Sequence, residues 1–279
     1  MSAEEKLVAV TGAGGFIGSH VVEELLRSGR RVRALVHYNG LGRSGYLDEV
    51  VPILSEDARA RLEIMAGDIS DARSVRELIA GCETVFHLAA LIGIPYSYTA
   101  PQSYVQTNIV GTLNLLEACR DQEVSRLIHT STSEVYGTAR TTPMTESHPL
   151  QAQSPYSATK VAADKLVESY HLSYGLPTVI LRPFNTYGPR QTLRAIIPTI
   201  IAQALDESCE SIRLGALDPV RDFTYVTDTA EAFRLLEEAP LEKVAGNTYN
   251  LGVGKGLSMG NLTQMILDIL EIKKPVESV

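Results

Sequence analysis

The strongest structural signal in this 279-residue chain is the stretch Leu7-Val-Ala-Val-Thr-Gly-Ala-Gly-Gly-Phe-Ile-Gly18. Its apolar start predicts a buried strand, and the apolar spacing over Phe16–Arg27 predicts a helix directly after it. Gly12, Gly15 and Gly18 have the spacing of a tight turn whose backbone can approach a pyrophosphate, which the helix N-terminus attracts. A glycine trio alone could be a structural turn, so its place after the first strand is what favours a dinucleotide site.

Strand-like and helix-like segments alternate from this turn onward. We expect further strands at residues 31–36, 62–65, 84–88, 126–130 and 178–181, and helices at 70–80, 103–120 and 156–174. Repeated βαβ units predict an α/β fold, a Rossmann-like doubly wound parallel sheet with helices on both faces. Prolines and glycines break the pattern after residue 183. We therefore expect a dinucleotide-binding domain with the catalytic residues over 1–183, and a smaller C-terminal substrate-binding lobe over 184–279.

Composition excludes several classes of protein. Hydrophobic residues make up 44% and charged residues 21% of the chain, which is ordinary for a globular protein. A net charge of −8 argues against a nucleic-acid partner. We find no apolar run long enough for a membrane span and no signal-peptide core. The 3 scattered cysteines fit neither a disulfide framework nor a metal cluster, so we expect no metal and a reducing cytoplasm.

The end of the second expected strand bears on which dinucleotide binds. An NAD site usually has Asp or Glu there to hold the ribose 2′-hydroxyl, whereas this strand runs into His37-Tyr-Asn39. Arg33 and Arg43 are close in sequence and could meet a 2′-phosphate or be ordinary surface charges, so NAD and NADP both stay open. Asp68, after the third strand, either accepts a hydrogen bond from the adenine amino group or caps the following helix.

A candidate catalytic pair is Tyr156 and Lys160, which share one face of an expected helix because they are four residues apart. A nearby ammonium lowers the pKa of a phenol and so provides a base for an alcohol proton, although ordinary amphipathic helices also show this spacing. The stretch Thr132-Ser-Glu134 follows the fifth strand, at the carboxyl edge where ligands bind in such sheets. Tyr136, just beyond it, is expected to be structural.

Several motifs occur in an order that is typical of one family. They are Thr11-Gly-Ala-Gly-Gly-Phe-Ile-Gly-Ser-His20, Gly67-Asp68, His87-Leu-Ala-Ala90, Asn108, Ser131-Thr-Ser-Glu-Val-Tyr-Gly137, Tyr156-x-x-x-Lys160, Arg182-Pro-Phe-Asn185-x-Tyr-Gly-Pro-Arg190 and Arg221-Asp-Phe-x-Tyr-Val226. On these motifs the chain resembles the extended short-chain dehydrogenase/reductase superfamily, with its NAD(P)-dependent nucleotide-sugar epimerases and dehydratases. Residues 88–98 and 137–156 resemble most closely the nucleotide-sugar 4,6-dehydratases of the legionaminic-acid type.

The resemblance implies a role for each matching position. Thr132 would hydrogen-bond the sugar O4, Tyr156 would take its proton, and Lys160 would bind the nicotinamide ribose and acidify Tyr156. Asn108 would support the helix that carries Lys160, unless it is simply a buried structural asparagine. The other implied cofactor-binding residues are Gly12, Gly15, Phe16, Ile17, Gly18, Asp68, Ile69, Leu88, Ala89, Ala90 and Pro183. The implied substrate-binding residues are Ser133 and, at the substrate diphosphate, Asn185, Arg190 and Arg221.

Two features depart from the family pattern. Dehydratases that act on dTDP-glucose carry Asp where this chain has Ser133, and that Asp serves as the acid for the departing C6 hydroxyl. GDP-mannose 4,6-dehydratases carry Ser there, so the resemblance implies that Glu134 takes over the acid role. Members of the superfamily also usually exceed 300 residues, whereas this chain ends at Val279. We therefore expect part of the substrate lobe to be absent or contributed otherwise.

The activity that the resemblance implies is nucleotide-sugar 4,6-dehydration. NAD(P)⁺ oxidises the C4 alcohol, Glu134 removes the acidified C5 proton, water leaves from C6, and the hydride returns to C6, which gives a 4-keto-6-deoxy sugar. The scaffold also serves 4-epimerases and UDP-glucuronate decarboxylases. Epimerases need no base at Glu134, but this carboxylate could instead be a structural acceptor for backbone N–H groups. A non-catalytic dinucleotide sensor would have no need of Tyr156 and Lys160.

The expected partners are a nucleotide-diphosphate sugar and a second copy of the chain. The helices at 103–120 and 156–174 carry more apolar residues than one sheet face needs, namely Val105, Ile109, Leu116, Val161 and Leu166. The resemblance implies a homodimer in which two such helices from each subunit form a four-helix interface. Packing against the sheet alone is the other explanation for these residues.

Overall fold

The structure, a computed structural model, describes residues 6–278, which divide into two compact units. The first unit contains the chain up to Pro183 together with Thr227–Leu251, and the second contains Phe184–Val226 and the chain from Gly252 onward. Residues 227–251 thus belong to the first unit and not to the lobe expected over 184–279. The reason is a strand pairing that no local pattern reveals, because β10 (Thr248–Leu251) lies parallel to β6 (Thr178–Pro183).

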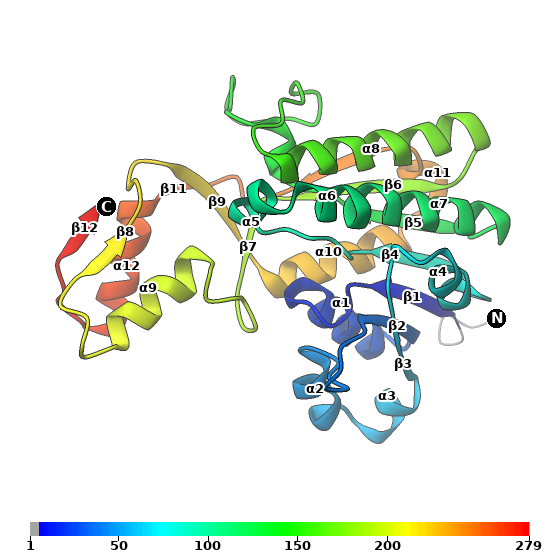
Figure 1. The fold of residues 1–279 in the computed structure, drawn as a ribbon, viewed down its shortest axis with the longest axis horizontal. Helices are drawn as coiled ribbons and strands as arrows, with labels where there is room; N and C mark the ends of the chain where they lie inside the picture. The colour runs from blue at the N-terminus through cyan, green and yellow to red at the C-terminus, as the bar shows by residue number, and fades with distance from the viewer. Residues whose placement is uncertain (1–5, 279) are drawn as a thin grey trace. The chain divides into compact units, whose positions relative to one another are not determined.

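The first unit is built on a sheet of seven parallel strands in the order β10-β6-β5-β4-β1-β2-β3 (Figure 1). The strand order reverses between β1 and β4, and ligands of such sheets bind beyond the carboxyl ends of the strands at this switch point. The doubly wound parallel sheet predicted from the sequence is confirmed. The bounds of its other strands are β1 (Leu7–Thr11), β2 (Arg31–His37), β3 (Leu62–Gly67), β4 (Thr84–His87) and β5 (Arg126–Thr130).

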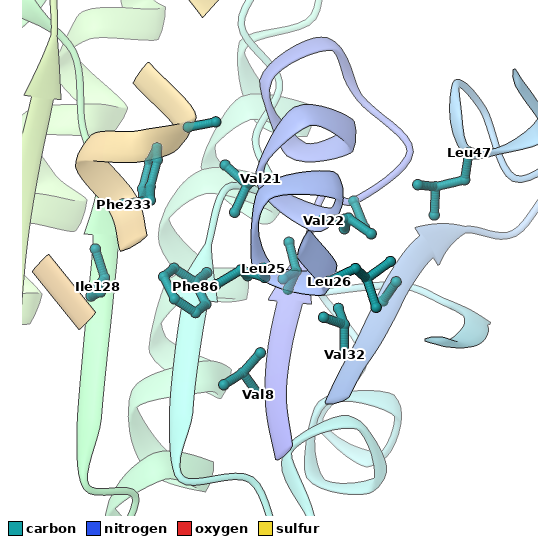
Figure 2. Close-up of a cluster of buried hydrophobic side chains, with 14 of the residues drawn as sticks. Val8, Val21, Val22, Leu25, Leu26, Val32, Leu47, Phe86, Ile128 and Phe233 are labelled. Carbon is teal, nitrogen blue, oxygen red and sulfur yellow. The ribbon is translucent and has the colours of Figure 1, made fainter. Parts of the chain in front are cut away.

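Apolar clusters lie on both faces of this sheet, because alternate strand residues point to opposite faces. Val8 belongs to the cluster that packs under α1 (Phe16–Arg27) and α10 (Val226–Glu238), and Figure 2 shows Phe86 and Phe233 within it. Ala9 belongs to the cluster on the other face. That second cluster packs under α4 (Ala72–Ile79), α7 (Gly111–Asp121) and α8 (Pro155–Tyr174).

The segment that follows β2 is rich in glycine and acidic residues, but part of it is buried. Leu47, Val50 and Ala58 are buried and join the cluster under α1. They lie on α2 (Leu47–Val50) and α3 (Glu56–Ala60), with a 3₁₀ turn at Val51–Ile53 between them. Short apolar anchors of this kind fix the segment beside the glycine turn.

The long helix expected over 103–120 is interrupted. It consists of α6 (Pro101–Tyr104), a π-helical segment at Val105–Val110 and α7. The short helices α5 (Ile94–Thr99) and α11 (Leu241–Val244) also belong to this unit. By contrast, α8 is continuous. Ser154 and Ser157 form a capping box at its start, and Gly175, with φ of +68°, ends it.

The second unit has its own apolar core. Its strands are β7 (Asn185–Tyr187), β9 (Val220–Tyr225) and β11 (Gly256–Ser258) in one sheet, and β8 (Ile212–Leu214) and β12 (Val276–Ser278) in another. Ile200 of α9 (Ile196–Leu205) and Leu262 of α12 (Met259–Leu270) are buried in this core. Among the described residues, no helix combines the length and the apolar character that crossing a membrane requires.

Candidate active site

The turn between β1 and α1 has a shape that only glycine permits. Gly12 has φ of +67°, and a Cβ there would lie 2.7 Å from the backbone nitrogen of Ala89. A Cβ on Gly18 would lie 2.2 Å from the carbonyl oxygen of Gly12. Gly15 occupies the N-cap of α1, which begins with Phe16 and Ile17. Glycine has no side chain that could accept hydrogen bonds from the first backbone N–H groups of this helix. The cradle therefore fits the pyrophosphate of a dinucleotide such as NAD(P).

Replacing Gly18 by alanine should disrupt this cradle. Because the new methyl group collides with backbone rather than with a flexible side chain, we expect a loss of about 1–3 kcal/mol of unfolding free energy. We also expect weaker binding of NAD(P), measured by calorimetry. Gly40→Ala is the matched control, because nothing lies within 4 Å of a Cβ at Gly40. Unchanged stability and binding in Gly18→Ala would contradict the structure of the turn.

The ends of β1 and β4 are joined at the switch point by one hydroxyl. Thr11 Oγ1 accepts hydrogen bonds from the backbone N–H groups of Leu88 (3.1 Å) and Ala89 (3.0 Å), and lies 2.8 Å from His87 Nδ1. These contacts place the segment from Leu88 to Ala90 directly beside the glycine turn. No local sequence signal indicated that Thr11 and His87 connect these two strand ends.

Asp68 and Ile69 follow β3 and have different surroundings. The Asp68 carboxylate accepts hydrogen bonds from the backbone N–H (2.8 Å) and hydroxyl (2.7 Å) of Ser70, and these bonds lower its pKa. The cap of α4 is Asp71, so the alternative expected for Asp68, capping the next helix, is wrong. Ile69, which was expected at the cofactor, is 5% exposed, and its side chain packs in the apolar core.

The two arginines considered for a 2′-phosphate lie in different settings. Arg33 Nε is 2.8 Å from Glu63 Oε2, and its Nη1 donates to the carbonyl oxygens of Leu78 and Ala80 at the end of α4. This arginine therefore stabilises the sheet and the neighbouring helix. Arg43 is exposed and, with Gly14, lines a cavity of about 600 Å³ beside the glycine turn.

The catalytic candidates come together where β5 and α8 meet. Thr132 begins a 3₁₀ turn (Ser133–Tyr136), and its hydroxyl accepts from the backbone N–H of Glu134 at 3.2 Å. The phenol of Tyr156, which is 7% exposed, lies close enough that both residues affect its pKa. Burial raises the pKa of Tyr156, a hydrogen bond with Thr132 lowers it, and the charge of Glu134 raises it. The hydroxyl, the carboxylate and the phenol thus form one cluster.

Lys160 is buried one turn further along α8. It is 3% exposed, and its Nζ donates to the carbonyl oxygen of Thr130 at 2.7 Å. Burial lowers the pKa of Lys160 to about 8, and the charge of Asp164 opposes this shift. The ammonium is therefore fixed to the end of β5, beside the residues that carry Thr132 and Glu134.

Asn108 connects α8 to the loop after β4. It lies in the π-helical segment, and its side-chain amide pairs with the backbone N–H (2.8 Å) and carbonyl (2.9 Å) of Leu91. Its Nδ2 also donates to Thr159 Oγ1 at 3.0 Å. Because Thr159 precedes Lys160, this buried asparagine can both stabilise the fold and support the lysine, so the two alternatives weighed for it coincide.

The substrate-binding candidates divide between the two units. Ser133 begins the 3₁₀ turn that follows Thr132, and Pro183, expected at the cofactor, is buried at the end of β6. Asn185 and Arg221 lie on β7 and β9 of the second unit, where Asn185 Nδ2 donates to the carbonyl oxygen of Asp222 at 3.2 Å. Arg190 follows β7 with a left-handed φ of +66°.

The sequence interpretation missed a buried charged pair behind the catalytic cluster. Asp164 of α8 and Arg182 of β6 are 1% and 5% exposed, and Arg182 Nη2 lies 2.9 Å from Asp164 Oδ2. A signal was present, because Asp164 follows Lys160 at helical spacing and Arg182 directly follows the apolar residues 179–181 of its strand. His129, buried on β5, faces the same carboxylate.

Comparisons with known proteins place this geometry in context. The family described as GDP-mannose 4,6 dehydratase matches residues 9–277. The chain is 36% identical to low-salt glycan biosynthesis protein Agl12 of Haloferax volcanii, over 94% of this chain and 81% of that protein.

Two solved structures are similar over nearly the whole chain. The dTDP-glucose 4,6-dehydratase DesIV of Streptomyces venezuelae, determined with NAD bound, has a TM-score of 0.87 and 33% identity, covering 98% of this chain and 84% of that one. The UDP-glucuronic acid 4-epimerase of Bacillus cereus, also determined with NAD, has a TM-score of 0.88 and 30% identity, covering 98% and 86%.

Proposed function

Because the chain belongs to the GDP-mannose 4,6-dehydratase family, we propose that it is a nucleotide-sugar 4,6-dehydratase that uses NAD(P). The observation that carries this proposal is the cluster of Thr132, Glu134 and Tyr156, in which the Glu134 charge lies near enough to the phenol to raise its pKa. An elimination needs such a second acid–base group beside the first, whereas the transfer of a hydride to and from C4 needs only the phenol. Similarity to the dehydratase DesIV supports the proposal.

The cofactor would lie in the cradle formed by the glycine turn and the segment that follows β4. When bound there, NAD(P) would supply hydride acceptance at C4 of the sugar and hydride return at C6. Tyr156 takes the proton of the C4 hydroxyl, and Thr132 holds the same oxygen by a hydrogen bond. Lys160, charged and fixed to Thr130, acidifies the phenol.

Glu134 performs the elimination. Its carboxylate removes the proton from C5 once C4 is a ketone, and the C5–H electron pair forms a C5–C6 double bond as the C6–O bond breaks. Glu134 then gives that proton to the departing hydroxyl, which leaves as water, and C5 takes a new proton from solvent when the hydride is returned to C6. Ser133 cannot supply the proton at neutral pH, since a hydroxyl is too weak an acid, so one carboxylate serves as base and then as acid.

A 4-epimerase is the second candidate, since the Bacillus cereus epimerase is structurally as similar as the dehydratase. The test is mass spectrometry after incubation of the enzyme with UDP-, GDP-, dTDP- and CDP-sugars. The proposal expects one of these sugars to lose the mass of one water. Conversion without a change in mass would favour the epimerase, and loss of carbon dioxide would favour a decarboxylase.

We further propose that the enzyme is a cytoplasmic homodimer. Val105, Leu113, Leu172 and Tyr174 on the π-helical segment, α7 and α8 are 37–75% exposed, which supports an apolar contact surface there. Leu116, expected in this interface, is instead fully buried in the sheet core. Three free cysteines, Cys82, Cys119 and Cys209, suit a reducing compartment.

Light scattering at micromolar concentration should give about twice the chain mass of 30.3 kDa. The expected reason is burial of the exposed apolar side chains of α7 and α8 against a second copy. Leu172→Glu, at a side chain that is 75% exposed, should shift the distribution toward monomer. A wild-type protein that is entirely monomeric would contradict the homodimer.

A further inference from the structure

A second buried charge lies one turn beyond Lys160 on α8. Asp164 is four residues further on and shares its helix face. Lys160 Nζ donates to the carbonyl oxygen of Thr130 at 2.7 Å, and Asp164 Oδ2 accepts from Ser131 Oγ at 2.8 Å. Because Thr130 and Ser131 are neighbours at the end of β5, the two side chains fix one stretch of helix to one point of the sheet.

Arg182 holds the Asp164 carboxylate from β6. Its Nε (3.1 Å) and Nη2 (2.9 Å) both donate to Asp164 Oδ2, while its Nη1 donates to the Tyr136 hydroxyl at 2.9 Å. The Tyr136 hydroxyl in turn donates to Asn250 Oδ1 at 2.7 Å. A buried ion pair needs such additional partners to offset its desolvation. The pair carries no net charge, so the Lys160 ammonium is a further positive charge beside it.

The buried histidines do not balance that charge. His129 Nε2 lies 3.4 Å from Asp164 Oδ1, and burial together with the charge of Lys160 lowers the pKa of His129 to about 4. Burial, His129 and Lys160 also hold the pKa of His87, on β4, well below its usual range. Both rings are therefore neutral at neutral pH.

Asp164 itself stays ionised. Burial raises its pKa, but the hydrogen bond with His129 and the charges of Arg182 and Lys160 outweigh this and hold it below the usual range. Among residues 6–278, Asp164 is the group whose charge raises the pKa of Lys160 against the effect of burial. Its carboxylate also raises the pKa of Tyr156 directly, so any benefit to catalysis must act through Lys160.

We propose that Asp164 is a positioning residue that, held by Ser131 and Arg182, keeps the Lys160 ammonium fixed and charged at neutral pH. The role of Lys160 in catalysis rests on the proposed function, but its charge state does not. Without the carboxylate, burial alone governs Lys160, and the side chain loses its proton at lower pH.

The test measures the unfolding free energy of the full chain by chemical denaturation between pH 5.5 and 10, for wild type and Lys160→Met. The difference between the two unfolding free energies reports on the protonation of Lys160. It is constant while the folded and unfolded states both hold the proton. It rises with pH once folded Lys160 has lost its proton and the unfolded side chain, with its ordinary pKa of 10.5, still holds it. We expect the rise to begin near pH 8.

The same comparison, with Lys160 and with Lys160→Met, is then made in the Asp164→Asn background. There the free-energy difference should begin to rise about one pH unit lower or more. The matched control is the Ser131→Ala background, which removes a hydrogen bond to the same carboxylate but keeps its charge, so the rise should still begin near pH 8. An unchanged onset in Asp164→Asn, or an equal shift in Ser131→Ala, would overturn the proposal.

If Asp164→Asn does not fold, the comparison of wild type with Lys160→Met still tests the proposal. A rise that already begins below about pH 7 would show that Lys160 is neutral at neutral pH, contrary to the proposal. None of these measurements uses a substrate. Their failure is therefore distinct from a failure to turn over any nucleotide sugar.

Discussion

Tyr156→Phe is expected to lower turnover by a factor of about 10²–10⁴, the usual contribution of a positioned acid–base group. The variant removes only the hydroxyl and keeps the buried ring. This ring packs edge-on against the ring of Tyr104, with 6.3 Å between the two ring centroids. Binding of NAD(P), measured by calorimetry, should barely change, because the glycine turn is untouched. The loss should therefore lie in kcat.

The matched control is Tyr174→Phe on the same helix. Its ring is 58% exposed, and its contacts with Tyr170 and Arg120 use the ring and not the hydroxyl. We expect normal turnover in this variant. Turnover near the wild-type level in Tyr156→Phe would show that the phenol is not the base.

Glu134→Gln should separate the elimination from the oxidation at C4. The amide keeps the shape of the side chain but cannot take the C5 proton, which becomes acidic only after C4 is a ketone. We expect the absorbance of reduced nicotinamide to rise by up to about one equivalent per site, while formation of the 4-keto-6-deoxy product falls by about 10²-fold or more.

Deuterium incorporation at C5 from heavy water provides a second readout for this variant, and it should disappear with the base. Glu77→Gln is the control, because that carboxylate pairs with Arg73 on the surface of α4. If Glu134→Gln keeps both product formation and deuterium incorporation, Glu134 only accepts backbone N–H groups. The C5 proton would then have to be removed by another group.

The sequence was most informative where chemistry is local. The bounds of β1 and α1 agree with the apolar pattern to the residue, because the glycines between them permit few other conformations. The helix expected over 156–174 begins one residue earlier, at Pro155 after the Ser154 cap, and ends as expected before Gly175. Local signals therefore located the glycine turn and the helix of Tyr156 and Lys160.

The pairing of strands that are far apart in the chain could not be predicted from the sequence. Residues 248–251 join the main sheet because they lie beside β6, some 70 residues earlier in the chain, and nothing in their own sequence specifies that partner. The π-helical segment at 105–110 was missed because its apolar spacing averages into that of an ordinary helix. Arg33 was ambiguous because its partners, Glu63 and the end of α4, come from other elements.

The most direct test of the central claim follows the hydrogen on C4. The nucleotide sugar that the enzyme converts is prepared with deuterium at C4, and the product is analysed by mass spectrometry and NMR. A 4,6-dehydratase should give a product that is lighter by one water and carries the deuterium at C6. A product of unchanged composition with the deuterium still at C4 would contradict the account.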